Sequence, residues 1–306
     1  MVDGGDGTPH DPVSHGDERG CDFCETGHDA KTYTPLRAHA PGANDPHAMT
    51  GRLAGRRILV VGAGTRPSKD PDAPVGNGRA ISALAGREGA VVACADVDRD
   101  AAEQTAALVR AEGAQAEVIV GDVTVEDDCA RIVDETVRGV GGLDGLVCNV
   151  GIGLGRGLAD TSVEEWDAVH AVNVRGHFLL CRAALPVMEE GGAIVLISSV
   201  AGLKPGTRIP AYDTTKAALA GLNRHVAFEG ARRGIRSNVV APGLIDTPLG
   251  RRATEGRPGR DRVPVPLGHR QATAWEVAAP VVFLLSNDAS YVTGQILAVD
   301  GGLSTL

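Results

Sequence analysis

The sequence predicts a doubly wound α/β fold, in which helices cover both faces of one parallel sheet. Two observations carry this prediction. Short apolar runs rich in β-branched residues alternate with stretches of helical pattern from Arg57 to the C-terminus, and glycines bound most of those runs. Strands that alternate with helices in this way form a parallel sheet covered on both faces. With 306 residues and 43% hydrophobic content, the chain can bury a substantial core.

The expected elements follow one another in a regular order. The first strand is RILVVG from Arg57, and a helix follows from about Arg79. A second strand, AVVACAD, precedes a helix over Ala101 to Glu112, and the third strand is AEVIVGDV. Further strands are expected at GLVCNV, AIVLISS, SNVVAPG and QILAVDG, with helical stretches between them. These elements form a single domain, which we place at residues 49–306.

Residues 1–48 differ from this domain. They are rich in Gly, Pro, Asp and His, lack hydrophobic periodicity, and hold nine acidic side chains against three basic ones. Such a segment buries too little apolar surface to offset the entropy of ordering it, so we expect a disordered tail. Cys21 and Cys24, flanked by His15 and His28, could in principle bind zinc. Their spacing matches no known zinc finger, and we expect no metal site.

Charge and hydropathy narrow the function classes. The formal net charge is -9 at pH 7, whereas nucleic-acid binding needs clustered Lys and Arg, so we expect no nucleic acid partner. No apolar run approaches the roughly 18 to 20 residues of a membrane helix, and the N-terminus lacks a signal-peptide pattern. We therefore expect a cytoplasmic protein with no membrane partner. The irregularly spaced cysteines of the domain should be buried free thiols: Cys94, Cys129, Cys148 and Cys181.

Glycines cluster where the first strand meets the first helix. The cluster consists of Gly62, Gly64, Gly76 and Gly78, with Asn77 between the last two. Glycines at such a junction permit a tight turn and let the backbone approach a pyrophosphate, which the helix N-terminus stabilises through its free N–H groups. The sequence therefore predicts a dinucleotide site, although glycine-rich turns also simply end strands.

Ten residues, Arg66 to Val75, interrupt this cluster. Pro67, Pro71 and Pro74 exclude a helix and stiffen the segment. A stiff loop rooted beside the pyrophosphate could cover the cofactor, or it could project into solvent or meet a neighbouring subunit. The sequence favours neither interpretation.

Two carboxylates follow the second and third strands. Asp96 ends the second strand, where a carboxylate accepts hydrogen bonds from the ribose hydroxyls and repels a 2′-phosphate. We therefore expect NAD rather than NADP as cofactor, although Arg66 and Lys69 could serve a phosphate. Asp122, beside Val123, could bind the adenine amino group or cap the following helix.

A phenol and an ammonium, Tyr212 and Lys216, are four residues apart in YDTTK and therefore lie on the same helix face. A phenol with its usual pKa near 10 is a poor base at neutral pH, and an adjacent cation lowers that pKa by favouring the phenolate. Taken alone, a Tyr and a Lys at this spacing usually lie on a solvent-exposed face of a helix. Ser198 and Ser199 at the end of AIVLISS, and Asn173 in AVNVRGHF, supply a catalytic context.

Together with the glycine cluster, NVG at 149–151 and PG at 242–243, these residues closely resemble the short-chain dehydrogenase/reductase family. The resemblance spans about residues 52 to 305 and implies a Rossmann-type domain. The chain departs from the family pattern where NVG replaces NAG, where Asp213 replaces a small residue, and at the ten-residue insertion. None of these departures touches the catalytic side chains.

The resemblance implies a role for each matching residue. Tyr212 would be the general acid and base, and Lys216 would lower its pKa and hold the nicotinamide ribose. Ser199 would bind the substrate oxygen, and Asn173 would hold a water behind Lys216, whereas Ser198 would be structural. The remaining residues expected at the cofactor, apart from those of the glycine cluster and the two carboxylate positions, are Asn149, Gly151, Pro242, Gly243, Ile245 and Thr247.

The expected function is hydride transfer between a nicotinamide cofactor and a secondary alcohol or ketone of a small molecule. The alternative is a catalytically silent dinucleotide-binding sensor or regulatory protein. Such a protein would have no chemical need for the complete set of Ser199, Tyr212 and Lys216. The resemblance also implies a homo-oligomer, commonly a tetramer, and a substrate lid at about residues 247–267. Arginines in that lid could recognise an anionic substrate, but a solvated basic loop is the more ordinary interpretation. The sequence does not identify the substrate.

Overall fold

The computed structural model of the chain describes residues 51–66, 73–252 and 264–306. Its central sheet contains one strand for each of the seven that the sequence predicts: β1 (Arg57–Val61), β2 (Val91–Asp96), β3 (Ala116–Val120), β4 (Gly145–Cys148), β5 (Ala193–Ile197), β6 (Arg236–Pro242) and β9 (Ile296–Val299). Two shorter strands that the sequence does not indicate, β7 (Ile245–Asp246) and β8 (Ala272–Thr273), pair with each other.

Helices connect the strands: α1 (Asn77–Arg87), α2 (Arg99–Ala111), α3 (Glu126–Val140), α4 (Gly157–Asp160), α5 (Val163–His170), α6 (Gly176–Val187), α7 (Pro210–Gly230), α8 (Pro248–Arg252) and α9 (Ala274–Leu285). A π-helical turn, η1 (Ala171–Arg175), joins α5 to α6, and a 3-10 turn, η2 (Val200–Gly202), follows β5. Both α1 and α2 begin two residues earlier than the sequence indicates. In α2 the reason is Asp98, whose carboxylate caps the helix by accepting hydrogen bonds from the first-turn amides.

The seven strands are hydrogen-bonded in the order β3-β2-β1-β4-β5-β6-β9, and every pair is parallel. The sheet is therefore wound outward from β1 through β2 and β3, and then in the opposite direction from β4. This reversal between β1 and β4 is a topological switch point. In doubly wound proteins the C-terminal ends of the strands border a ligand-binding crevice at that point.

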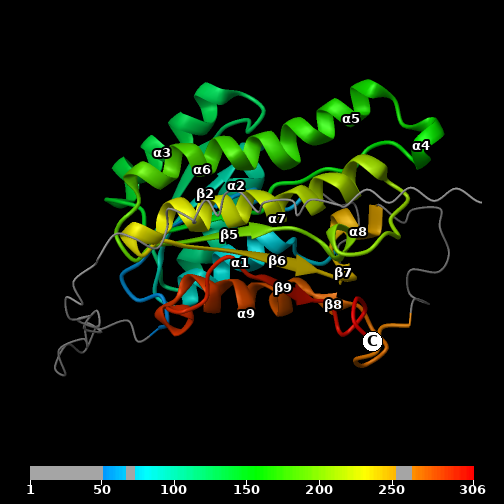
Figure 1. Ribbon diagram of the computed structural model, residues 1–306. Helices are drawn as coiled ribbons and strands as arrows, with labels where there is room; N and C mark the ends of the chain where they lie inside the picture. The colour runs from blue at the N-terminus through cyan, green and yellow to red at the C-terminus, as the bar shows by residue number, and fades with distance from the viewer. Residues whose placement is uncertain (1–50, 67–72, 253–263) are drawn as a thin grey trace, which may run out of the picture. The chain divides into compact units, whose positions relative to one another are not determined.

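Helices cover both faces of the sheet, as predicted (Figure 1). One hydrophobic core joins the sheet to α1, α2 and α9, and a second joins its opposite face to α3, α6 and α7. Within β1, Ile58 and Val60 belong to the first core, and Leu59 and Val61 belong to the second. Because neither side of the strand faces water, the strand is apolar along its whole length, which is the pattern that predicted the fold.

Four cysteines are buried free thiols, as predicted: Cys94, Cys129, Cys148 and Cys181. None of the helices in the described ranges is long and apolar enough to cross a membrane. In the same ranges, no group of three or more His, Cys, Asp or Glu side chains is arranged to hold a metal ion. The expected tail with Cys21 and Cys24, residues 67–72 of the insertion and residues 253–263 of the expected lid lie outside the described residues.

Candidate active site

The glycine cluster forms a tight junction between β1, β4 and the start of α1. Gly62 has a φ of +78°, and a Cβ there would lie 2.7 Å from the backbone nitrogen of Val150. A Cβ on Gly78 would lie 1.9 Å from the Gly62 carbonyl oxygen. That same oxygen accepts a hydrogen bond of 2.7 Å from Asn149 Nδ2. Only glycine fits at positions 62 and 78, and Asn149 steadies the turn from the neighbouring strand.

The first turn of α1 suits an anionic ligand. No side chain caps this helix at Gly76, and its first turn contains no acidic residue, so its N–H groups remain available for an anion. The Oδ1 atom of Asn77 is buried and accepts no hydrogen bond from any described residue. An orphaned buried acceptor costs free energy unless a ligand supplies a donor. Both features fit a bound dinucleotide, whose pyrophosphate is anionic and whose riboses carry hydroxyl donors.

The ten-residue insertion leaves this junction intact. The Gly76 amide donates a hydrogen bond of 2.9 Å to Thr65 Oγ1, so the residues on either side of the insertion meet. Val75 packs against the core that contains α1. The two ends of the insertion therefore lie side by side.

Asp96 lies at the C-terminal end of β2, beside the glycine cluster. Its Oδ2 accepts a hydrogen bond of 2.8 Å from the Gly64 amide, and its Oδ1 accepts one of 3.1 Å from the Asp98 amide. Each carboxylate oxygen can accept a second hydrogen bond, so Asp96 keeps the capacity to bind ribose hydroxyls.

Asp122 and Val123 follow β3. The Oδ1 atom of Asp122 accepts hydrogen bonds of 2.8 Å from both the amide and the hydroxyl of Thr124. Because α3 begins only after Val125, Asp122 caps the preceding turn and not the helix itself. The side chain of Val123 is buried in the core, which leaves its backbone as the part that could face a cofactor.

Tyr212 and Lys216 lie on α7, and Lys216 Nζ is 5.6 Å from the centroid of the Tyr212 ring. Only 4% of Lys216 is exposed, and its Nζ donates a hydrogen bond of 2.8 Å to the Ile197 carbonyl at the end of β5. Burial disfavours the ammonium form and lowers the pKa of Lys216 to about 8. When charged, this ammonium acts on the nearby phenol through a medium of low dielectric constant, where electrostatic attraction is strong.

Asn173 lies in the π-helical turn η1, a type of turn found frequently at functional sites. Its amide side chain pairs with the backbone of Ile152, accepting from the nitrogen and donating to the oxygen, both at 2.9 Å. Its second Nδ2 hydrogen bonds to Thr215 Oγ1 at 3.0 Å, and that hydroxyl in turn donates to the Tyr212 carbonyl. The side chain therefore ties the segment after β4 to the helix that carries Tyr212. The water expected behind Lys216 stays a prediction.

Two glycines keep this region open. A Cβ on Gly151 would lie 3.2 Å from Lys216 Nζ, which is tighter than nine in ten real Cβ contacts. A Cβ on Gly153 would lie 3.5 Å from both Tyr212 Cδ2 and Ile209 Cδ1, which is ordinary van der Waals contact. Gly151 thus makes room for the lysine, and Gly153 lies directly beside the tyrosine ring.

The two serines after β5 have different surroundings. Ser198 Oγ donates a hydrogen bond of 2.7 Å to the Lys216 carbonyl and joins β5 to α7. Ser199 Oγ accepts a hydrogen bond of 3.2 Å from the Ala201 amide at the start of η2, so the hydroxyl keeps its hydrogen to donate. Of the pair, Ser199 is the one suited to bind a substrate oxygen.

The segment after β6 completes this edge of the sheet. Gly243 packs so closely on Asp300 that a Cβ would lie 2.6 Å from the Asp300 Cβ. Ile245 lies in the core, and Thr247 Oγ1 accepts a hydrogen bond of 3.1 Å from the Gly250 amide at the start of α8. These residues and Pro242 follow the C-terminal end of β6, as the glycine cluster follows that of β1. The structure thus brings the predicted site residues to one edge of the sheet.

Comparison with known proteins identifies the family. The family model described as Enoyl-(Acyl carrier protein) reductase matches residues 74–304. The 2-(S)-hydroxypropyl-CoM dehydrogenase 3 of Xanthobacter autotrophicus is 36% identical to the chain over 84% of its length and 100% of that protein's. This chain is a short-chain dehydrogenase/reductase.

Two further relatives agree with this assignment. Cyclopentanol dehydrogenase of a Comamonas species is 35% identical over 82% of this short-chain dehydrogenase/reductase and 98% of that protein. The crystal structure of levodione reductase superposes with a TM-score of 0.75 at 33% identity, covering 82% of this chain and 98% of that one. The predicted fold, family and reaction class are thereby confirmed, and the cofactor of the family is a nicotinamide dinucleotide.

Two residues of the site have no role in the sequence-based prediction. Thr215 and Asp213 connect the catalytic helix to its surroundings, whereas Gly153 and Thr207 lie in the segments 152–156 and 201–208 that the sequence predicts as pocket walls. One signal could have indicated Thr215, since it is three residues after Tyr212 and precedes Lys216, so it shares their side of the helix. Asp213 was visible only as a departure from the family pattern.

Proposed function

We propose that this short-chain dehydrogenase/reductase transfers a hydride between NAD and a carbon that carries a secondary alcohol or ketone oxygen, with Tyr212 as general acid and base. The observation that carries the proposal is the buried Lys216 ammonium 5.6 Å from the Tyr212 ring. The names of the relatives support the substrate class, because cyclopentanol and 2-hydroxypropyl groups are secondary alcohols.

In this mechanism the protein manages the proton while the bound nicotinamide supplies or accepts the hydride. During ketone reduction, negative charge develops on the substrate oxygen, and the hydroxyls of Tyr212 and Ser199 stabilise it by hydrogen bonding. Tyr212 then donates its proton to that oxygen, and Lys216 stabilises the resulting phenolate. During alcohol oxidation, the phenolate accepts the hydroxyl proton as the hydride leaves.

A panel of secondary alcohols and ketones tests this proposal, with nicotinamide absorbance as the readout. We expect turnover of at least one ketone with NADH or of at least one alcohol with NAD. If the protein bound NADH but turned over no member of the panel, the proposed function would be contradicted.

The cofactor preference is proposed from Asp96. Its carboxylate would repel a 2′-phosphate, so kcat/KM should be higher with NAD than with NADP. Asp96→Ser is expected to narrow that ratio about tenfold or more, since placing like charges together costs several kcal/mol. The ratio is the readout because Asp96 also holds the Gly64 amide, and its loss could weaken both cofactors alike. Asp100→Ser removes an exposed negative charge nearby and should leave the ratio unchanged. A wild type that prefers NADP would refute the assignment.

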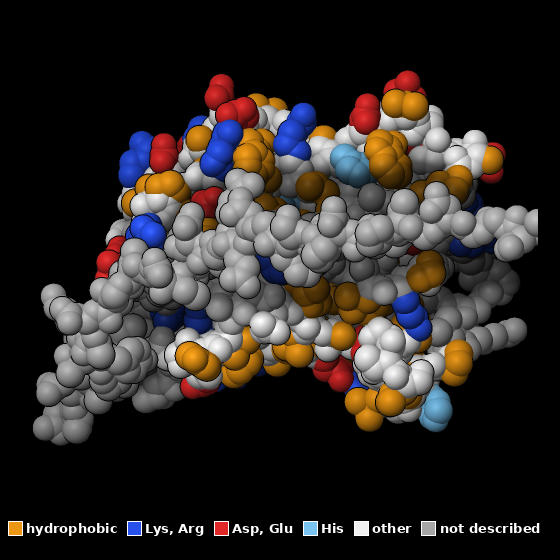
Figure 2. All heavy atoms as spheres, in the orientation of Figure 1, with side chains coloured by type: hydrophobic (Ala, Val, Ile, Leu, Met, Phe, Trp, Pro, Cys, Tyr) orange, Lys and Arg blue, Asp and Glu red, His pale blue; other side chains and the backbone are white. Residues whose placement is uncertain are grey.

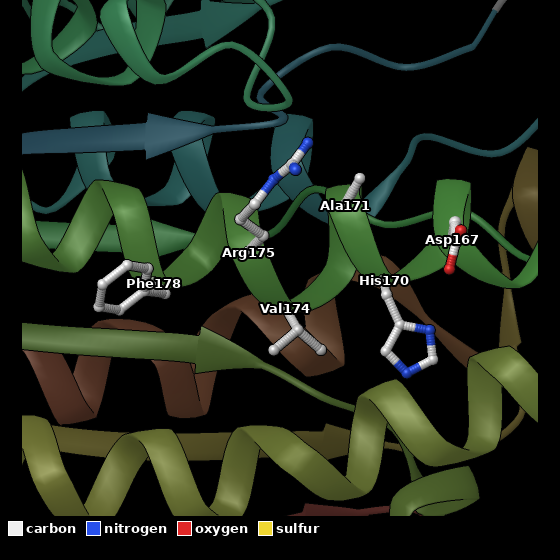
Figure 3. Close-up of a pocket in the computed structure, with 6 residues that line it drawn as sticks. All are labelled: Asp167, His170, Ala171, Val174, Arg175 and Phe178. Carbon is white, nitrogen blue, oxygen red and sulfur yellow. The ribbon is translucent and has the colours of Figure 1, made fainter.

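We also propose that the enzyme is a homotetramer. Phe178 on α6 and Phe228 on α7 are exposed, and hydrophobic side chains reach the surface over α5 and α6 and along β9 and α9 (Figure 2). A shallow groove along α5, η1 and α6 is lined by Asp167, His170, Ala171, Val174, Arg175 and Phe178 (Figure 3). Copies of the chain packed on the α5–α6 side and on the β9–α9 side would remove these side chains from water.

Light scattering should give four times the chain mass of 31.5 kDa. Phe228→Glu should shift the protein to smaller species, because the interface would bury an unpaired charge. Val97→Glu, at an exposed apolar residue on the loop after β2, is the matched control and should leave the mass unchanged. A monomeric wild type at micromolar concentration would overturn the assignment.

A further inference from the structure

Asp213, the residue after Tyr212, binds the loop that leads into α7. The Thr207 hydroxyl donates a hydrogen bond to the Asp213 carboxylate, and it accepts one of 3.0 Å from the Ile209 amide. Ile209 occupies the N-cap position of α7, where its apolar side chain cannot cap the helix. The Thr207 hydroxyl therefore connects the first turn of the catalytic helix to the loop before it.

The residue between these two, Arg208, has an uncommon backbone conformation. Its φ is +63°, in the left-handed region that costs a residue with a side chain roughly 1 to 2 kcal/mol. In this conformation its carbonyl oxygen accepts a hydrogen bond of 2.8 Å from the Gly157 amide. Gly157 also has a positive φ, and its own carbonyl accepts from the Thr161 hydroxyl at 2.6 Å. Arg208 therefore joins the 203–209 loop to the 152–161 segment.

Both segments reach the catalytic tyrosine. Ile209 ends the first, Gly153 belongs to the second, and a Cβ on Gly153 would contact both Ile209 Cδ1 and the Tyr212 ring at 3.5 Å. A substrate that exchanges a proton with Tyr212 would therefore bind against these two segments, which would form the walls of its pocket. Backbone strain such as that at Arg208 persists only where surrounding contacts impose it. The Thr207 hydroxyl provides two such contacts, because it is hydrogen-bonded to the Ile209 amide and to the Asp213 carboxylate, and both partners follow Arg208 in the chain.

We propose that Asp213 and Thr207 are positioning residues, which hold the two substrate-binding segments in place through the conformation of Arg208. The proposal rests on the function proposed above, since it assigns these segments to the substrate. Without the Asp213–Thr207 contact the walls would have to become ordered when the substrate binds, and that entropy cost would weaken substrate binding. Neither residue is among those expected to bind the cofactor, so cofactor affinity should be independent of the contact.

Hydrogen exchange of the protein without substrate tests the contact directly. Thr207→Val and Asp213→Ala should both accelerate amide exchange about tenfold or more in peptides covering residues 153–161 and 203–209, because the contact involves a charged acceptor. The matched control is Thr207→Ser, which keeps the hydroxyl and should exchange at the wild-type rate. Asp213→Asn keeps an acceptor oxygen without the charge, so its exchange rate should lie between those of the wild type and Asp213→Ala. Wild-type exchange in Thr207→Val would overturn the proposal.

Steady-state kinetics then tests the role in substrate binding. With a ketone selected from the panel, Thr207→Val and Asp213→Ala should raise KM about tenfold, change kcat less than about threefold, and leave the NADH dissociation constant unchanged. A fall in kcat at constant KM would show that Asp213 and Thr207 position Tyr212 and do not order the pocket walls. If the wild type turned over no substrate, the proposed function would fail while the exchange measurement still decided whether the contact orders both segments.

Discussion

Tyr212→Phe is expected to lower kcat for ketone reduction by about a hundredfold or more, the usual range for the loss of a positioned acid and base. The substitution removes only the hydroxyl, so the ring should still pack beside Gly153 and Ile209. Fold and NADH affinity should therefore be retained. Stopped-flow measurement of NADH oxidation in a single turnover isolates the chemical step from product release.

The control for this substitution is Tyr291→Phe, which removes a hydroxyl from a fully exposed tyrosine. It should leave both kcat and NADH binding at wild-type values. Near wild-type turnover in Tyr212→Phe would refute the proposed mechanism. Loss of NADH binding in the same variant would instead show that the phenol holds the cofactor.

Lys216→Met is expected to reduce kcat by a similar factor, about a hundredfold or more, because the phenolate of Tyr212 would lose its nearest buried cation. The loss should be greatest near neutral pH, where the wild-type ammonium is protonated. Lys216→Arg keeps the charge and should retain more activity than Lys216→Met. Equal kcat values in Lys216→Met and Lys216→Arg would show that the positive charge of Lys216 does not contribute to catalysis.

The same variant makes a prediction about stability. Burial lowers the pKa of Lys216 to about 8, whereas an unfolded lysine titrates near 10.4, so between these values the unfolded state binds more protons than the folded state. The free energy of unfolding of the wild type should therefore rise with pH in this window relative to that of Lys216→Met. The change is on the order of 3 kcal/mol. Urea unfolding of both proteins between pH 7 and pH 10.5 measures this change. If the free energies of unfolding of the two proteins had the same pH dependence, burial would not lower the pKa of Lys216.

The sequence by itself was sufficient for the features that depend on local pattern. Strands buried on both faces are apolar along their length, so runs such as that of β1 predicted both the strands and the helical layers around them. A spacing of four residues on a helix likewise placed Tyr212 and Lys216 on one face. The glycines between the first strand and the first helix also predicted a tight junction. The structure agrees, because no side chain fits at Gly62 or Gly78.

Only the tertiary structure decided what surrounds those residues. Lys216 is desolvated because β5 and η2 pack on α7, and its Nζ finds its partner in Ile197, nineteen positions earlier in the chain. Asn173 meets Ile152 because a π-helical turn and the end of β4 come together. The carbonyl of Arg208, a residue in the left-handed conformation, accepts its hydrogen bond from Gly157, about fifty residues earlier in the chain. Such contacts join segments that are distant in the chain, and their free energy depends on the packing of the whole domain, which no local pattern encodes.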